Sequence, residues 1–504
     1  LITAIENALR IEVIVTMIIG VGAAIIIGAL PGLTATMGVA LILPVTFGMD
    51  PVSGLLLLVS VYFGSIYAGS IPAILLNTPG TPASAATAID GYPLSLQGKA
   101  HKALMLSIIA SVIGGIFSII VLMLVAPQLA QFALKFSSPE SFALALFGLS
   151  IITSISSQSL IKGIIVASIG LMVATVGQDP TDGFPRYAFG NVYLMGGIPF
   201  IPILIGMFAL AEAFRMMEHS LKNDDVLKNL KNTMRNVTLK WLEFKGLIVT
   251  ILRSSGIGTF IGMIPGAGPD IAAYVAYNEA RRFSKNKQQF GNGAMEGVAA
   301  AEAANNAASG GAFIPLLSLG IPGDAVTAVM LGALMIQGLR PGPLLFEQSA
   351  DIVYTLFAGM LIALLIVLCY GLLGMRLFVK VLHVSPVILS PIILMLCVIG
   401  SYALGNNFYD VWVMFISGIV GFFLIRYGFP VSPIILALIL GPLMEVNLRR
   451  TLVSHGTIEV VFTRPISATL LILAIITLLS PVVAQFVSKW KKNRTSSTYG
   501  GDAS

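Results

Sequence analysis

Residues 104–125 read LMLSIIASVIGGIFSIIVLMLV and contain no charged side chain. A helix needs about 20 apolar residues to cross roughly 30 Å of hydrocarbon, so this stretch predicts a transmembrane helix. Similar stretches recur along the chain, at residues 13–30, 356–373 and 470–487. A removable signal peptide would account for one apolar run near the N-terminus, not for runs that continue to the C-terminus.

The composition extends this prediction to the whole chain. Only 10% of the 504 residues are charged, against about 25% in soluble domains, and the mean hydropathy is +0.93. We therefore expect an all-α polytopic membrane protein with about a dozen transmembrane helices in the lipid bilayer. The net charge of +6 does not indicate nucleic acid as a partner, because the basic residues lie in short stretches between spans, as the positive-inside rule predicts.

The most polar internal segment, residues 215–245, contains seven basic and four acidic residues. We expect a cytoplasmic linker there. It separates a first membrane repeat, 1–214, from a second, 246–463. A terminal transmembrane helix, 464–488, and a basic, polar tail, 489–504, complete the expected organisation.

Landmarks of the first half recur in the same order in the second half. Pro72 and Pro79-Gly80 recur with identical spacing as Pro315 and Pro322-Gly323. The other landmarks are Gly28-Ala-Leu-Pro31-Gly32 with Gly262-Met-Ile-Pro265-Gly266, Gln97-Gly98 with Gln337-Gly338, Ser138-Pro139 with Ser385-Pro386, and Pro199-Phe-Ile-Pro202 with Pro430-Val-Ser-Pro433. Such an ordered series indicates internal duplication. We expect the two repeats to be inverted in the membrane, as in many secondary carriers.

Each half contains two Pro-Gly breaks within apolar segments. Proline lacks an amide donor and glycine adopts non-helical angles, so each break predicts an interrupted helix or a re-entrant hairpin. A single proline more often marks a kink, but breaks at corresponding positions of two halves point to a carrier's binding site, where half-helix amides face an anion. The residues that we expect to bind substrate are Pro31, Gly32, Thr34, Asn77, Thr78, Pro79, Gly80, Thr81, Pro265, Gly266, Ala267, Gly268, Pro322 and Gly323.

A run of small and polar residues from Glu302 to Gly311 precedes the last break. Its amide and hydroxyl oxygens suit a hard cation such as Na⁺, and tight helix packing explains the same residues equally well. Asp324 and Asp270 follow breaks, where each could hold a cation or a proton or occupy a first helical turn; the second role is favoured for Asp270. The cation-coupling candidates are Asn305, Asn306, Ser309, Asp324 and Asp270.

Other charged residues have simpler expected roles. Asp50, Asp90 and Asp410 predict helix caps or turns. The basic residues Lys99, His101, Lys102 and Arg340 predict a membrane surface. The four histidines are too scattered to form a metal site, so we expect no cofactor and no metal beyond a coupling Na⁺.

Several functional classes fit the sequence poorly. The chain contains no G-x-x-x-x-G-K-[ST] nucleotide-binding loop, so transport energy must come from an ion gradient or another subunit. We expect no enzyme, because Asp324 and Asp410 occur in the wrong order and motif for an intramembrane aspartyl protease. Channels also contain broken helices, but a duplicated chain with paired breaks favours a carrier.

The motifs resemble those of the large membrane subunit of tripartite tricarboxylate transporters, the TctA family. The resemblance covers nearly the whole chain apart from the linker and tail, and it rests on Leu30-Pro31-Gly32, Pro44-Val-Thr-Phe-Gly48-Met-Asp50-Pro51, Tyr67-Ala-Gly69-Ser70-Ile-Pro72-Ala-Ile-Leu-Leu-Asn77-Thr78-Pro79-Gly80, Asp90-Gly91-Tyr92-Pro93, and Glu302-Ala-Ala-Asn305-Asn306 leading to Gly320-Ile-Pro322-Gly323. The family often has an acidic residue where this chain has Thr81, and a small polar one where it has Asp324.

The resemblance implies a multi-pass secondary transporter of the bacterial inner membrane. It implies import of di- and tricarboxylates, citrate-like organic anions, driven by a gradient of Na⁺ or H⁺. It also implies two protein partners, a small membrane subunit and a periplasmic solute-binding protein.

Overall fold

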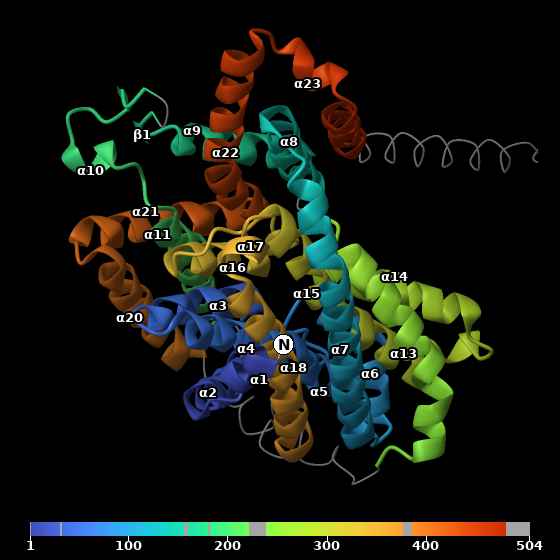
Figure 1. Ribbon diagram of the computed structural model, residues 1–504. Helices are drawn as coiled ribbons and strands as arrows, with labels where there is room; N and C mark the ends of the chain where they lie inside the picture. The colour runs from blue at the N-terminus through green and yellow to red at the C-terminus, as the bar shows by residue number, and fades with distance from the viewer. Residues whose placement is uncertain are drawn as a thin grey trace, which may run out of the picture. The chain divides into compact units, whose positions relative to one another are not determined.

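The computed structural model describes residues 2–30, 33–155, 160–179, 182–220, 238–375 and 386–479. Pro31, Gly32 and Ser385, most of the expected linker 215–245, the end of the expected terminal helix 464–488 and the tail 489–504 lie outside these residues. The described chain is almost entirely helical (Figure 1). Its one small sheet pairs β1 (Gly177–Gln178) antiparallel with β2 (Pro185–Arg186).

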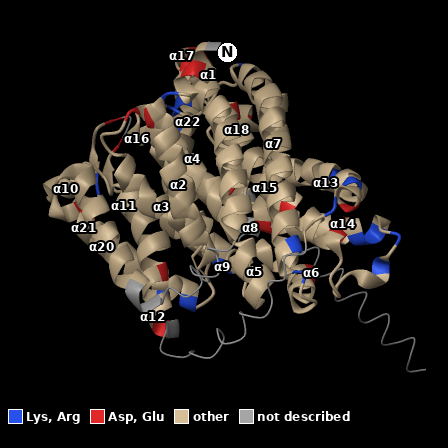
Figure 2. Cartoon of the chain, turned by 90° about the horizontal axis from the view of Figure 1, so that it is seen from below, with Lys and Arg blue, Asp and Glu red and all other residues tan. Residues whose placement is uncertain are grey.

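Eight of the described helical segments are long and apolar enough to cross a membrane, and five shorter ones are apolar. The expectation of an all-α polytopic membrane protein is therefore confirmed. Figure 2 shows few charged residues along most helices, with Lys and Arg gathered around α13 and α14. The eight long segments are Ile11–Ala29, Pro51–Leu76, Ala100–Ala133, Phe200–Glu218, Trp241–Gly262, Ala350–Leu373, Phe408–Arg426 and Ser432–His455.

The chain forms two compact units, and each draws on both halves of the sequence. The first comprises residues 1–135 and 201–423. Its helices are α1 (Ile2–Ala8), α2 (Ile11–Ala29), α3 (Ala35–Ile42), η1 (Leu43–Thr46), α4 (Pro51–Ala68), α5 (Ser70–Leu76), α6 (Ser84–Leu96), α7 (Ala100–Ala133), α11 (Phe200–Leu204), η2 (Ile205–Leu210), α12 (Ala211–Ser220), α13 (Trp241–Gly262), α14 (Gly268–Phe283), η4 (Lys287–Gln289), α15 (Met295–Leu319), α16 (Ala325–Ile336), α17 (Leu345–Gln348), α18 (Ala350–Leu373), α20 (Pro386–Gly405) and α21 (Phe408–Arg426).

Two helical segments form the centre of the first unit. Every residue of α15 from Gly297 to Ser318 is buried, and α4 is buried from Ser53 to Ala68. Alanine, glycine and serine predominate in α15, and α7, α13 and α14 pack closely against it (Figure 1). Small residues allow such close backbone approach between membrane helices. The segments α4–α5 and α15 are those that lead into Pro79-Gly80 and Pro322-Gly323.

The second unit comprises residues 136–200 and 424–504. It contains α8 (Ser138–Ile155), α9 (Leu160–Ala174), the β1–β2 hairpin, α10 (Val192–Met195), α22 (Ser432–His455) and α23 (Glu459–Thr463). Helix α22 packs against both α8 and α9. Arg186 of β2 forms an ion pair of 2.6 Å with Glu445 of α22, which fastens the hairpin to that helix.

Matching contacts occur in both units. In the second unit Gly170 of α9 lies against Ile434 and Ala437 of α22. In the first unit Gly418 of α21 lies against Leu210 of η2. Each contact joins a helix from residues 1–214 to a helix from residues 246–463.

Candidate functional site

The break at residues 77–83 begins where α5 ends. Asn77 takes a left-handed conformation, with φ of 56°, and the amide of Thr78 donates to the carbonyl of Pro72 at 3.3 Å. Ser84 begins α6, and the hydroxyls of Thr81 and Ser84 accept hydrogen bonds from each other's backbone amides. The loop is therefore held by its own residues at both ends.

The break at residues 320–324 has the same entry. Helix α15 ends at Gly320, with φ of 72°, and the amide of Ile321 donates to the carbonyl of Pro315 at 3.2 Å. A left-handed residue at this position is the usual end of a helix. The two loops thus leave their helices in the same way, five residues after equivalent prolines.

The glycine of each Pro-Gly dipeptide occupies a position with no room for a side chain. A Cβ on Gly80 would lie 2.5 Å from the carbonyl oxygen of Gly28, and one on Gly323 would lie 2.8 Å from that of Gly262. Gly28 and Gly262 are themselves equivalent in the two halves, at the ends of α2 and α13. In the second half the amide of Gly266 also donates to the carbonyl of Gly323 at 2.7 Å, so both breaks of that half join directly.

Asp324 closes the second-half loop with its side chain. Its carboxylate caps α16 by accepting from the amide of Thr327 at 2.7 Å. The second carboxylate oxygen accepts a hydrogen bond from the hydroxyl of Tyr62, a buried residue of α4 in the other half. Asp324 therefore acts as a cap, one of the two roles considered from the sequence, and also ties this loop to the first half.

The breaks of the two halves meet. Asp270, in the first turn of α14, lies near Asp324 and near the backbone amide of Ala83. Ala83 and Ala86 of α6 pack with Ala273 of α14 and Ala301 of α15. The structure therefore brings three of the four predicted breaks into one region of the first unit. The fourth break contains Pro31 and Gly32, which are not described; Thr34 beyond it caps α3.

Two predicted site residues present buried polar atoms that have no hydrogen-bond partner within the described residues. They are the side-chain amide of Asn305, at both its nitrogen and its oxygen, and the hydroxyl of Thr78. Asn305 is completely buried. Because buried polar groups are almost always paired, each of these atoms calls for an occupant such as an ion, a water or a ligand group.

The two loops differ in their accessibility. In the first-half loop the side chains of Asn77 and Pro79 are exposed and that of Thr78 is half-buried, whereas Gly80 and Thr81 are buried. In the second-half loop residues 320–324 are all buried. Most amides of both loops donate to residues of the flanking helices and helix ends, such as Gly69, Pro72 and Pro315, so side chains rather than free amides are the accessible polar groups.

The remaining candidates have local partners. The side chain of Asn306 donates to the carbonyl of Glu302, within the same helix, at 3.2 Å. Ser309 lies near the hydroxyl of Tyr62. Gly268, at φ of 60°, lies against Asp324. Pro265 and Ala267 are buried beside it.

Asp90 differs from expectation. It lies inside α6, not at a cap or turn of its own segment, and it is completely buried. One carboxylate oxygen accepts hydrogen bonds from the amides of Gly291, Gly293 and Ala294, at 2.8–2.9 Å. The other accepts from the hydroxyl of Tyr277, whose pKa is raised by burial and by the charge of Asp90. Only a distant loop could supply these donors, so the sequence around Asp90 did not reveal them. Asp50, by contrast, caps α4 as expected.

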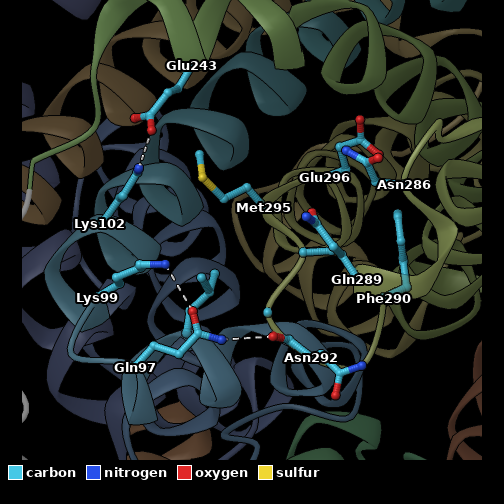
Figure 3. A pocket seen from close by; sticks show the side chains of 13 residues that line it. Gln97, Lys99, Lys102, Glu243, Asn286, Gln289, Phe290, Asn292, Met295 and Glu296 are labelled. Carbon is cyan, nitrogen blue, oxygen red and sulfur yellow. Dashed lines mark hydrogen bonds and ion pairs between the residues drawn. The ribbon is translucent and has the colours of Figure 1, made fainter.

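A polar cavity of about 390 Å³ lies where α6, α7, α13 and α15 begin or end, away from the breaks (Figure 3). Lys102 in its wall is nearly buried and pairs with Glu243 at 2.6 Å. Gln97 beside it donates to the carbonyl of Asn292 at 2.9 Å. Its counterpart Gln337 donates to the carbonyl of Thr46 at 3.1 Å. Each of these two equivalent glutamines therefore donates a hydrogen bond to the opposite half of the chain.

Sequence reasoning assigned no role to Tyr62 or to Glu302. Glu302 is completely buried in α15 and accepts hydrogen bonds from Thr87 of α6 and Ser111 of α7. The available signal was a lone carboxylate within a run of alanines, since ionisable residues in membrane segments are rare and usually functional.

Comparison with known proteins gives consistent matches. The family model described as "Tripartite tricarboxylate transporter TctA family" matches residues 14–436. An "Uncharacterized 52.8 kDa protein in TAR-I ttuC' 3'region" of Agrobacterium vitis is 37% identical over 470 residues, 92% of each chain. An "Uncharacterized protein in TAR-II ttuC' 3'region" of the same organism is 39% identical over 233 residues, 46% of this chain and 96% of that one. No solved structure matches.

Proposed function

Because the chain belongs to the tripartite tricarboxylate transporter TctA family, we propose that it is the large permease subunit of a binding-protein-dependent secondary transporter. It imports di- and tricarboxylates, citrate-like organic anions, across the bacterial inner membrane. A gradient of Na⁺ or H⁺ drives the import by symport. A periplasmic solute-binding protein delivers the substrate, and a small membrane subunit completes the complex.

The observation that carries this proposal is that broken helices meet in one region of the first unit, while a loop residue and a residue of the adjoining helix keep unpartnered buried polar atoms. Asn77, Thr78 and Asn305 offer amide and hydroxyl donors, which can bind carboxylate oxygens. Asn305 also offers an amide oxygen, which can bind a cation. A transporter needs such a site within its membrane domain, reached through irregular backbone that hydrocarbon alone would not tolerate.

The arrangement also favours a carrier built from two inverted repeats. The equivalent loops make the same backbone contacts, and Gln97 and Gln337 each bind the opposite half. Such reciprocity is what a two-fold relation between repeats produces.

Uptake measurements test the proposal. Proteoliposomes that contain this chain with its small subunit should accumulate labelled di- or tricarboxylate only when the loaded binding protein is present. Asn77→Ala, Thr78→Ala and Asn305→Ala should each reduce uptake by tenfold or more, as expected when a ligand contact of about 1.4 kcal/mol or more is lost.

The driving ion is found by collapsing the Na⁺ and H⁺ gradients separately. Uptake that survives the collapse of both gradients would exclude a secondary transporter. Normal uptake by the three alanine variants would show that the binding site lies elsewhere. It would not contradict the proposal that the protein is a transporter.

A further inference from the structure

Glu302 is surrounded by hydroxyl groups at the centre of the first unit. Its carboxyl oxygens accept from Thr87 of α6 and, at 2.9 Å, from Ser111 of α7. Ser107, one turn before Ser111, also lies near the carboxyl group and shares a hydrogen bond of 2.8 Å with Ser70 of α5. All of these hydroxyls are buried. Four helices therefore contribute to one enclosed polar cluster, the Glu302 cluster.

No basic residue among the described residues neutralises Glu302, since the groups that contact its carboxyl are the hydroxyls of Thr87, Ser111 and Ser107. Of the titratable groups on the helices packed against α15, Tyr67 of α4 faces it. Other titratable groups on these helices have different neighbours: Tyr62 of α4 binds Asp324, Asp90 of α6 binds the 291–294 loop, Lys102 of α7 pairs with Glu243 of α13, Arg253 lies over Phe283, Asp270 of α14 lies beside Asp324, and Tyr277 binds Asp90.

An ionised carboxylate in this position is costly. Removing a charge from water without a counter-ion costs several kcal/mol, so a buried acid favours its neutral form. Hydroxyl groups can donate to a carboxylate and can also accept from a carboxylic acid. The Glu302 cluster can therefore hold the group in either protonation state without rearranging its helices.

The geometry fits a proton better than Na⁺. A bound Na⁺ needs several oxygens turned toward one point between them. In this cluster the hydroxyls of Thr87 and Ser111 contact the two carboxyl oxygens directly, one on each. The protein hydrogen bonds thus occupy the places that an ion would take.

The cluster is connected to the candidate binding loop. Thr87 lies in the first turn after Ser84, where α6 leaves the 77–83 break. A change of charge at Glu302 changes the donor and acceptor roles of the Thr87 hydroxyl, and this links protonation of Glu302 to the first turn of the helix that follows the loop.

We propose that Glu302 is the proton-binding residue that couples carboxylate uptake to a proton gradient, an inference that rests on the proposed function. A proton from the outer aqueous phase converts the carboxylate to a carboxylic acid before the loaded protein exposes its site inward. The acid returns that proton to the inner phase after the substrate leaves. No other covalent change takes place.

The test compares Glu302→Gln with Glu296→Gln, the same change nearer the start of α15, in proteoliposomes that contain the whole complex. An inward proton gradient should stimulate uptake several-fold in the wild type and in Glu296→Gln. Glu302→Gln should lose this stimulation and retain exchange of internal for external carboxylate. Glu302→Asp keeps a titratable group, and its uptake should follow a displaced pH profile.

A second measurement does not depend on transport. Infrared difference spectra across a pH titration should contain a protonated-carboxyl band that disappears in Glu302→Gln and persists in Glu296→Gln. A band unchanged in Glu302→Gln, or proton-gradient stimulation that survives this substitution, overturns the inference. Uptake driven by Na⁺ alone overturns it as well and leaves the proposed function standing. Absence of carboxylate uptake by the wild type under every gradient overturns both.

Discussion

The two loops that contain Pro79-Gly80 and Pro322-Gly323 share a backbone and differ in their side chains. Thr81 and Asp324 both follow the dipeptide, and Tyr62 and Asn305 both lie ten residues before the equivalent prolines Pro72 and Pro315. Tyr62 binds Asp324 across the halves. The side-chain amide of Asn305, at the corresponding place, has no hydrogen-bond partner among the described residues.

This difference assigns different roles to the two loops. The second-half loop is fixed, because it is buried, capped and tied to Tyr62. The first-half loop is the accessible one, with Asn77 exposed and an unpaired Asn305 on the helix that packs behind it. The two loops therefore share a backbone frame, and the difference at one pair of positions leaves unpartnered buried polar atoms beside the first-half loop.

The largest expected effect concerns what the loops share. Gly80→Ala and Gly323→Ala should each lower the free energy of unfolding by about 1–3 kcal/mol, because the added Cβ meets backbone atoms that cannot move aside. Thermal unfolding in detergent measures this effect. Gly256→Ala, in open space on α13, is the matched control and should not destabilise. A loss confined to one loop would break the equivalence.

The next effect concerns where the loops differ. Tyr62→Phe should destabilise by about 0.5–1.5 kcal/mol, because a buried hydrogen bond to Asp324 is lost. Asn305→Ala removes no hydrogen bond of its side chain, so stability should be unchanged or increased while uptake falls. Unfolding and uptake are measured on the same preparations. Equal destabilisation by both variants would show that Asn305 is a structural residue.

A smaller effect on stability distinguishes the role of the backbone conformation of Asn77 from the role of its side-chain amide. Glycine adopts the left-handed conformation freely, so Asn77→Gly should preserve the loop and remove only the amide group. Asn77→Ala should cost about 1 kcal/mol more in stability, because alanine disfavours that conformation. If uptake follows stability across this pair, and Asn77→Gly transports normally, the amide does not bind substrate.

The smallest expected effect concerns the reciprocal glutamines. Gln97→Ala and Gln337→Ala should each destabilise by about 0.5 kcal/mol, because each loses one hydrogen bond to a carbonyl outside the buried core. We expect the two variants to lose the same free energy of unfolding. Chemical or thermal unfolding of both single variants and of the double variant measures this loss. A clear difference between the two would indicate that only one of these contacts holds the halves together.

Much of this arrangement could be predicted from the sequence, because apolar length and Pro-Gly breaks are local signals. The spans and the positions of the breaks follow from them, whereas for Asp324 the sequence left a helix-end role and a cation or proton role both open. The partners of Asp90, Asp324 and Glu302 could not be predicted, since each comes from the other half of the chain. No spacing rule relates a carboxylate to a donor that lies some two hundred residues away.

The hydrogen bonds that Asp90 accepts from residues 291–294 have a consequence for biogenesis. The donors Gly291, Gly293 and Ala294 follow Asp90 by 201, 203 and 204 residues. The ribosome synthesises Asp90 long before it synthesises these amides. The Asp90 carboxylate therefore lacks these hydrogen-bond donors until residues 291–294 have been made. Contacts of such sequence separation form slowly. The first half therefore depends on the second to complete its fold, and mutations in residues 291–294 should appear first as poor insertion and rapid degradation of newly made protein.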